Sequence, residues 1–250
     1  RYVGGEFNSV HKDPNTDLTR VALAFPDIYD LGVPNLGLAI FYDSLNRDPG
    51  IWAERVYAPW IDMETEMRER SLPLYTLESK TPLAEMDVIG FTLPYESLCT
   101  NLLNMLDLAE LPVKAAERNE RHPLIVAGGH ATFNPEPMSL FIDAFVIGEG
   151  EEAFPEIINI ARGAKKSKTP RSDLLNQLAK IEGVYVPSFY TPKYNLNGTL
   201  IATMPNRDDL PRKIRKRIVP ILPPPPEHFV VPSIDVIQNR VAVEIMRGCS

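Results

Sequence analysis

The stretch that decides the fold is Arg20-Val-Ala-Leu-Ala-Phe25, an apolar run closed by Pro26. A short apolar run bounded by a turn residue is typical of a strand buried inside a parallel sheet. Similar runs recur along the chain, each followed by a turn and, in most cases, a segment with helical spacing. These further predicted strands are Arg55–Ala58, Asp87–Leu93, Pro123–Ala127 and Ile142–Ile147.

Helical segments separate the predicted strands. The spacing of apolar and charged residues predicts helices over 38–45, 62–70, 94–109 and from about 152 to 162. Because crossovers between parallel strands are right-handed, this alternation predicts a sheet with helices on both faces. We expect residues 18–165 to form one doubly wound α/β domain with a five-stranded parallel sheet in flavodoxin-like strand order.

The flanking segments have a different character. Residues 1–17 are expected to form an N-terminal arm, and residues 166–239 a helix, a β-hairpin and a proline-rich linker. The hairpin is predicted from runs at 184–190 and 199–203 on either side of Asn195-Leu-Asn-Gly198. Four consecutive prolines within 220–226 predict an extended linker. Residues 240–246 are predicted to be a final strand, so that 240–250 would start a second domain.

Bulk properties exclude several classes of protein. The chain has 250 residues and a net charge of −7, which disfavours nucleic-acid binding by the whole surface. Two cysteines are too few for a secreted disulfide scaffold and favour the reducing cytoplasm. No apolar run is long enough to span a membrane. The chain starts without Met and ends at Gly248-Cys249-Ser250, so we expect it to be a piece of a longer polypeptide.

The loops after the predicted strands carry unusual residues. In a doubly wound sheet, ligands bind beyond the carboxyl ends of the strands. Glycines there let the backbone approach a ligand, and helix N-termini offer free N–H groups. The alternative is that these are ordinary tight turns. The candidate cofactor-binding residues are Asp27, Tyr29, Gly32, Thr92, Leu93, Gly128, Gly129, His130 and Glu149.

These loops resemble a known family. The segments 27–32, 92–93 and 128–129 stand where cobalamin-binding domains carry D-x-H-x-x-G, S-x-L and G-G. The run from Gly128 to Glu151 is similar to the segment before the barrel in cobalamin-dependent-type radical S-adenosylmethionine (radical SAM) proteins. Residues 241–249, Val-Ala-Val-Glu-Ile-Met-Arg-Gly-Cys, resemble the first barrel strand and the first cysteine of their C-x-x-x-C-x-x-C motif.

The resemblance, to an uncharacterised cobalamin-binding radical SAM subfamily, implies an enzyme in the full-length protein. Three cysteines, of which Cys249 is the first, would hold a [4Fe–4S] cluster that binds S-adenosylmethionine and cleaves it to a radical. The α/β domain would bind cobalamin or shape the substrate cleft. Since Cys249 is the only cysteine of the motif in this chain, the chain lacks a complete active site.

The chain departs from the family pattern at Tyr29, where cobalamin domains have a histidine. Three interpretations follow: cobalamin without a protein ligand, cobalamin bound through Tyr29, or a fold that has lost the cofactor. His130 could line the same cavity or simply be hydrogen-bonded. Glu149 could contact a ligand or belong to the acidic first turn of the next helix. Cys99, on an apolar helix face, is interpreted as a structural thiol.

Two other classes of function stay open at this point. One is a non-catalytic module that binds a small molecule, such as cobalamin, at the same sheet edge. The other is an RNA-contacting module built on the basic run Pro211-Arg-Lys-Ile-Arg-Lys-Arg217. The run has no interleaved aromatic residues and the chain is acidic, so its composition favours a solvated linker face.

Overall fold

The computed structural model describes residues 1–238 and 240–247. Its main sheet has the strand order β2-β1-β3-β4-β5-β6, in which β1 to β5 are parallel and β6 is antiparallel to β5. The prediction of a doubly wound sheet with flavodoxin-like order is confirmed, with one added edge strand. The strands are β1 Thr19–Phe25, β2 Ile51–Tyr57, β3 Val88–Thr92, β4 Leu124–Gly128, β5 Ala144–Val146 and β6 Val184–Tyr185.

Helices cover the sheet in two pairs. α2 packs on α5 through an edge-to-face contact of Phe41 and Phe154, with ring centroids 5.6 Å apart. α3 is tied to α4 by an ion pair of 2.9 Å between Arg68 and Asp107. The α-helices are α1 Tyr29–Gly32, α2 Leu36–Asn46, α3 Ile61–Arg70, α4 Cys99–Leu108, α5 Gly150–Ser167 and α6 Arg171–Leu178. Between these layers, β1, β3 and β4 are almost entirely buried.

Strand β2 is longer than the apolar pattern predicts. It starts at Ile51, four residues before the predicted strand, and every one of its residues is buried. Two of them are charged: Glu54 is fully buried and accepts a hydrogen bond from Thr76, and Arg55 is 3% exposed. Charged residues interrupt the apolar pattern of a strand. They can be buried only because they have partners elsewhere in the chain, which the local sequence does not show.

The segment after α6 forms a hairpin around the predicted turn, with the predicted second strand but a different first strand. β7 Tyr190–Tyr194 pairs with β8 Leu200–Pro205, and residues 195–199 connect them. Val184 and Tyr185, which we expected in the first hairpin strand, instead form β6 and pair with β5. These two side chains are buried on the main sheet, and this burial outweighs the pairing in an exposed hairpin.

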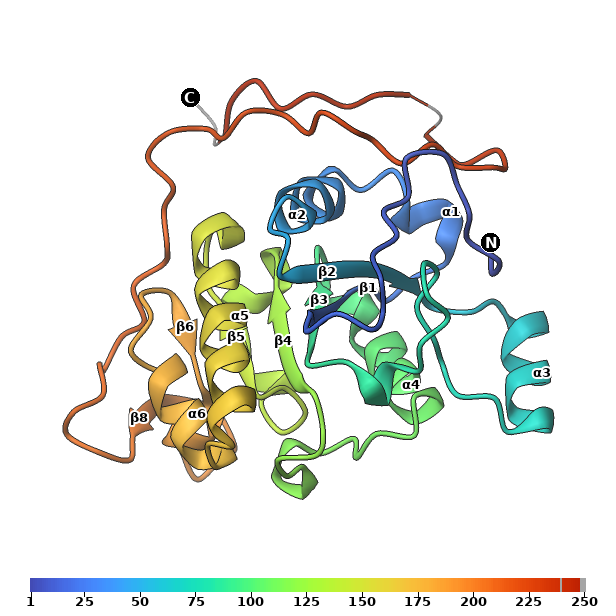
Figure 1. The fold of residues 1–250 in the computed structure, drawn as a ribbon. Helices are drawn as coiled ribbons and strands as arrows, with labels where there is room; N and C mark the ends of the chain where they lie inside the picture. Colours follow the sequence, from blue (N-terminus) through green and yellow to red (C-terminus); the bar gives the residue numbers. More distant parts are fainter. Residues whose placement is uncertain (239, 248–250) are drawn as a thin grey trace.

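The linker after β8 returns to the top of the molecule and crosses above α2 (Figure 1). There it meets the N-terminal arm: Phe7 and Val231 form an antiparallel bridge, and Asn8 donates to the Phe229 carbonyl at 3.0 Å. The predicted strand at 240–246 is not present, since the described residues of this segment belong to no strand. A strand needs a neighbour for its ladder, and none of the described segments pairs with it.

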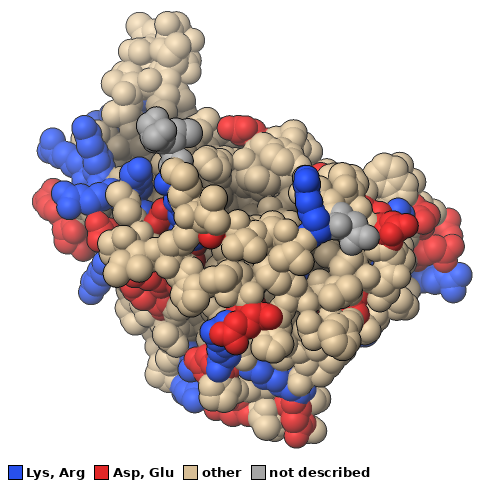
Figure 2. Space-filling view, turned by 90° about the horizontal axis from the view of Figure 1, so that it is seen from above, with Lys and Arg blue, Asp and Glu red and all other residues tan. Residues whose placement is uncertain are grey.

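The upper face of the molecule, which the linker crosses, carries few charges at its centre (Figure 2). Figure 2 shows lysines and arginines gathered mainly at one side of this face, the side of the hairpin and residues 206–217. Among the described residues, Arg212, Lys213, Arg215 and Lys216 are exposed. No helix in the described part of the chain is both long and apolar enough to cross a membrane.

Candidate functional site

The strand order reverses between β1 and β3, and the loops after these two strands are connected. Asn101 of α4 donates a hydrogen bond from Nδ2 to the Pro26 carbonyl at 2.9 Å. The Asp27 carboxylate lies close to the Tyr95 hydroxyl, and burial together with this carboxylate raises the pKa of Tyr95. In doubly wound sheets such a reversal opens a crevice for ligands. Asp27 and Tyr95 therefore mark the two sides of the candidate site.

The glycine pair after β4 lets a neighbouring backbone come close. Leu93 donates its N–H to the Gly128 carbonyl at 2.7 Å. Gly129 has a φ of 111°, and a Cβ there would stand 2.5 Å from the Leu93 carbonyl oxygen. Thr92, the last residue of β3, is paired with Gly128 in the ladder and half-buried. Since the Leu93 side chain is buried, this part of the edge can offer a ligand mainly backbone.

Exposed aromatic rings lie beside the glycine pair. His130 is exposed, and its ring centroid is 6.3 Å from that of Phe133, which is also exposed. Thr132 fixes this turn, because its hydroxyl donates to the carbonyls of Gly129 and Val146 at 2.7 and 3.0 Å. Aromatic faces on a fixed turn can stack on a planar ligand. The prediction that His130 is part of this edge is consistent with its position.

Tyr29 is buried and takes part in a polar network. Its hydroxyl donates to Glu6 at 3.0 Å, and its ring packs edge-on against Tyr57 at 5.4 Å. Burial and the Glu6 carboxylate raise the pKa of the Tyr29 phenol well above its ordinary value. A neutral, hydrogen-bonded phenol is a poor metal ligand. The described geometry therefore does not fit Tyr29 as a ligand of cobalt.

Gly32 is required for a different reason. A Cβ at this position would meet the Tyr57 ring at 2.4 Å and the Phe25 ring at 3.1 Å. The glycine allows α1 to lie directly on the ends of β1 and β2. Its role in the described structure is packing against these rings.

The centre of the buried network, Arg55, was not predicted from the sequence. Arg55 pairs with Glu78 at 2.6 Å and with Glu6 at 3.0 Å, and all three side chains are buried. Burial opposes the charge, but Glu78 and Glu6 outweigh it and raise the pKa of Arg55. Their separation in the chain leaves no spacing signal for such a network. A cavity of about 30 Å³ beside Arg55 is lined in part by residues 228–230 of the linker, so the linker and the N-terminal arm both contact the surroundings of this network.

The Gly148-Glu-Gly-Glu151 loop after β5 holds the linker. Gly148 forms a parallel bridge with Arg217, and a Cβ on Gly148 would stand 2.3 Å from the Arg217 carbonyl oxygen. Glu149 donates its N–H to that oxygen at 3.0 Å, and its carboxylate accepts a hydrogen bond from the Val219 N–H. The carboxylate predicted to contact a cofactor is thus bonded to the linker.

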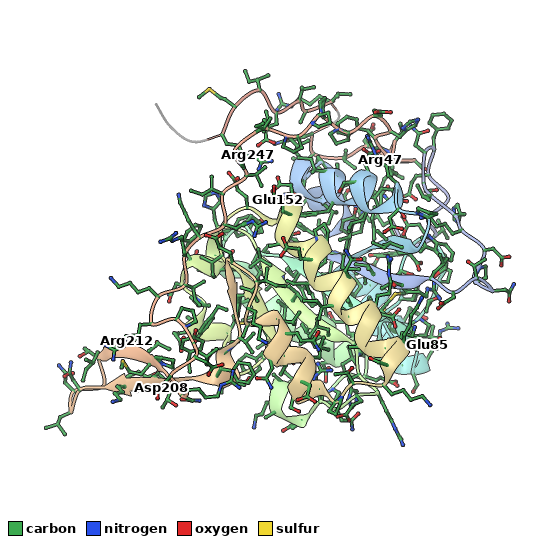
Figure 3. All side chains as sticks on the ribbon, turned by 60° about the vertical axis from the view of Figure 1, so that its left-hand side comes forward. Arg47, Glu85, Glu152, Asp208, Arg212 and Arg247 are labelled. Atoms are coloured by element: carbon green, nitrogen blue, oxygen red, sulfur yellow. The ribbon has the colours of Figure 1, made fainter. Side chains whose placement is uncertain are left out.

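Arg217 of the linker and Arg247 from the segment after it, which the sequence did not single out as partners, bind the start of α5. Arg217 pairs with Glu152 at 2.6 Å and with Glu156 at 2.9 Å. Arg247 pairs with Glu151, and its guanidinium lies 3.7 Å from the Glu149 carboxylate. Figure 3 shows Arg247 above Glu152 at the upper end of α5, at the carboxyl end of the sheet.

The described residues contain no group of three or more His, Cys, Asp or Glu that could hold a metal ion. Cys249, the predicted cluster ligand, lies outside the described residues. Cys99 is partly buried against the core, and burial raises the pKa of its thiol, which favours the neutral form. A single thiol of this kind does not fit the ligand set of an iron–sulfur cluster.

Comparison with known proteins gives one family. A family model described as "Radical SAM proteins, N-terminal" matches residues 37–187. Two similar solved structures are of the radical S-adenosylmethionine methyltransferase TsrM from Kitasatospora setae, each with 14% identity and a TM-score of 0.42.

One TsrM structure has a tryptophan substrate and a SAM analogue bound; the match covers 72% of this chain and 29% of that one. The other has cobalamin and a [4Fe–4S] cluster bound, with coverages of 84% and 32%. This chain therefore spans about a third of the length of those proteins. No curated protein matches.

Proposed function

The chain belongs to the family of radical SAM proteins, whose N-terminal region it matches, and on this premise we propose that it is the N-terminal part of a radical SAM enzyme. The full protein would use a [4Fe–4S] cluster and S-adenosylmethionine, with Cys249 as the first cluster ligand. The observation that carries the proposal is the family match over 37–187, which includes β2, β3, β4 and β5 of the parallel sheet.

Within this enzyme, we propose that the α/β domain forms one wall of the cleft at the carboxyl edge. Asp27 and Tyr95 would orient a polar group at the strand reversal, Thr92 would line the same crevice, and Gly128 and Gly129 would present backbone to the ligand. His130 would contribute a ring face. The exposure of Tyr95 and Phe133 supports this role, because large apolar rings on a surface often mark a contact site.

If the cleft holds a cobalamin, which would supply cobalt chemistry, Tyr29 would not be among the residues that bind the metal. The hydroxyl of Tyr29 is hydrogen-bonded to Glu6, and the ring is buried, so neither is available to a ligand at the exposed turn of His130. We therefore expect Tyr29→Phe to leave the visible spectrum of added cobalamin unchanged. A shift of the absorbance bands in the variant alone would contradict this assignment.

The experiment that tests the enzyme is made on the full-length protein. Its sequence should contain cysteines four and seven residues after Cys249, as the C-x-x-x-C-x-x-C motif requires. The anaerobically reconstituted protein should hold about four irons per chain and cleave S-adenosylmethionine to 5′-deoxyadenosine. If those cysteines are absent, the domain is instead a binding module, and cobalamin titration then tests that function.

A further inference from the structure

The acidic start of α5 holds two arginines, one from the linker and one from the segment that follows it. Glu152 and Glu156 bind Arg217, and Glu151 binds Arg247. Arg247 is also paired with Glu244 at 2.7 Å. The pair of Glu151 and Arg247 joins residues 96 positions apart in the sequence. A contact over this separation fixes the path of the chain, whereas the pair within 244–247 is local.

The Arg247 site is more enclosed than an ion pair within a single exposed helix. The side chains of Arg247 and Glu151 are 22% and 17% exposed, whereas those of Arg70 and Glu66 in a pair on α3 are 69% and 51% exposed. Exposed pairs contribute little, because water and salt screen them. A partly enclosed guanidinium with several carboxylates around it is held more firmly.

The position of this site decides what it can do. Glu149 directly precedes α5 and follows β5, so Arg247 is held at the carboxyl edge of the sheet. Cys249 follows Arg247 by two residues in the sequence. Two residues of chain span at most about 7 Å. Whatever holds Arg247 therefore limits how far Cys249 can stand from this edge.

We propose that Glu149 and Glu151 are positioning residues, which hold Arg247 so that the chain enters the cluster motif at the carboxyl edge of the α/β domain. This assignment rests on the proposed function for its consequence, but the contact itself does not. It gives the acidic loop after β5 a defined role: the loop holds the residue that precedes the cluster motif at the carboxyl edge.

The first measurement reads the contact directly. Full-length protein is labelled with phenylglyoxal, which reacts with free guanidinium groups, and the rates at Arg247 and Arg212 are read by peptide mass spectrometry. Arg212 is exposed and serves as the internal reference. We expect Arg247 to react several-fold more slowly than Arg212 in the wild type and at a similar rate in the Glu149→Gln/Glu151→Gln double variant.

The control is Glu85→Gln, which removes one carboxylate charge, against two in the double variant, from an exposed residue. Glu85 lies at the opposite end of the molecule from Arg247 (Figure 3). It should leave both labelling rates unchanged. Equal rates at Arg247 and Arg212 in the wild type, or protection that survives the double variant, would overturn the assigned contact.

The second measurement reads the consequence in the same proteins. We expect the double variant to keep its iron content, to lower kcat for S-adenosylmethionine cleavage at least tenfold, and to leave KM nearly unchanged. Arg247→Lys, which keeps the charge, should behave more like the wild type than Arg247→Ala. Full iron with unchanged kcat would overturn the positioning role. A wild type without iron would instead contradict the proposed function, and the labelling would still report on the contact.

Discussion

Gly129 shows how one residue maintains the candidate site. Its φ of 111° and the 2.5 Å that would separate an added Cβ from the Leu93 oxygen both exclude a side chain. Gly129→Ala should therefore lower the free energy of unfolding by about 1–3 kcal/mol, measured by urea denaturation. Gly163→Ala is the control, because it adds the same methyl on α5 where no atom lies within 4 Å. It should be neutral or raise stability by about 0.5–1 kcal/mol; equal losses in both variants would contradict the argument.

Glu6 makes the buried network sensitive to acid. Burial would raise its pKa, but Arg55 outweighs burial, and the pKa of Glu6 lies below its ordinary value of 4.5. A carboxylate with a lowered pKa stabilises the fold above its unfolded pKa and loses this contribution as pH falls through the folded pKa. Glu6→Gln should cost about 1.5–3 kcal/mol at neutral pH. The difference from the wild type should shrink in acid, below about pH 4.5.

The measurement is urea unfolding of both proteins from neutral pH down to about pH 3. Asp48 and Glu120 also have lowered pKa values, but neither is changed by the substitution, so their effect cancels in the difference. Glu85→Gln is the charge control and should follow the wild type. A constant difference across the range would show that Glu6 does not contribute through its charge.

At the scale of elements, packing between α5 and the sheet depends on Gly90. A Cβ on Gly90 of β3 would stand 2.5 Å from Cζ of Phe154 on α5. Gly90→Ala should cost about 1–3 kcal/mol through overpacking. In a Phe154→Leu background the ring is absent, and the same substitution should cost little. A double-mutant cycle by urea denaturation gives the coupling, and additive losses would contradict the proposed contact.

The elements that the sequence predicted are those whose apolar residues are consecutive. β1, β3 and β4 lie within two residues of their predicted bounds, because uninterrupted burial leaves a plain apolar run. The prediction for β2 missed residues 51–54, because Glu54 interrupts the apolar run and its burial depends on partners such as Thr76. The strand predicted over 240–246 has an alternating pattern, but a pattern alone does not supply the neighbouring strand.

At the scale of the whole molecule, the sequence predicted that the candidate site lies at the carboxyl edge of the sheet. It did not predict the contacts within the site. Asp27, Gly128 and Gly129 lie at the carboxyl ends of their strands, because strand direction and loop position follow from the βα order. The partners of Tyr29 and Glu149 were not predictable in this way. They come from the N-terminal arm and the linker. The motifs in the sequence do not indicate where these flanking segments contact the domain.

The linker is expected to be held to the domain mainly at Arg217. Its side chain is 18% exposed and binds Glu152 and Glu156, whereas Arg212 and Lys213 are exposed. Trypsin binds a basic side chain and the adjoining backbone only when both are accessible. The rate of cleavage at each site therefore reports local unfolding. In the wild type, cleavage after residues 212 and 213 should precede cleavage after Arg217.

Glu152→Gln/Glu156→Gln should accelerate cleavage after Arg217 several-fold and leave cleavage after Arg212 unchanged, as followed by mass spectrometry over time. The backbone bridge between Gly148 and Arg217 stays in the variant, so the remaining protection measures the bridge alone. If cleavage after Arg217 does not change, the bridge rather than the two carboxylates holds the linker. The acidic turn of α5 would then serve only the segment that contains Arg247.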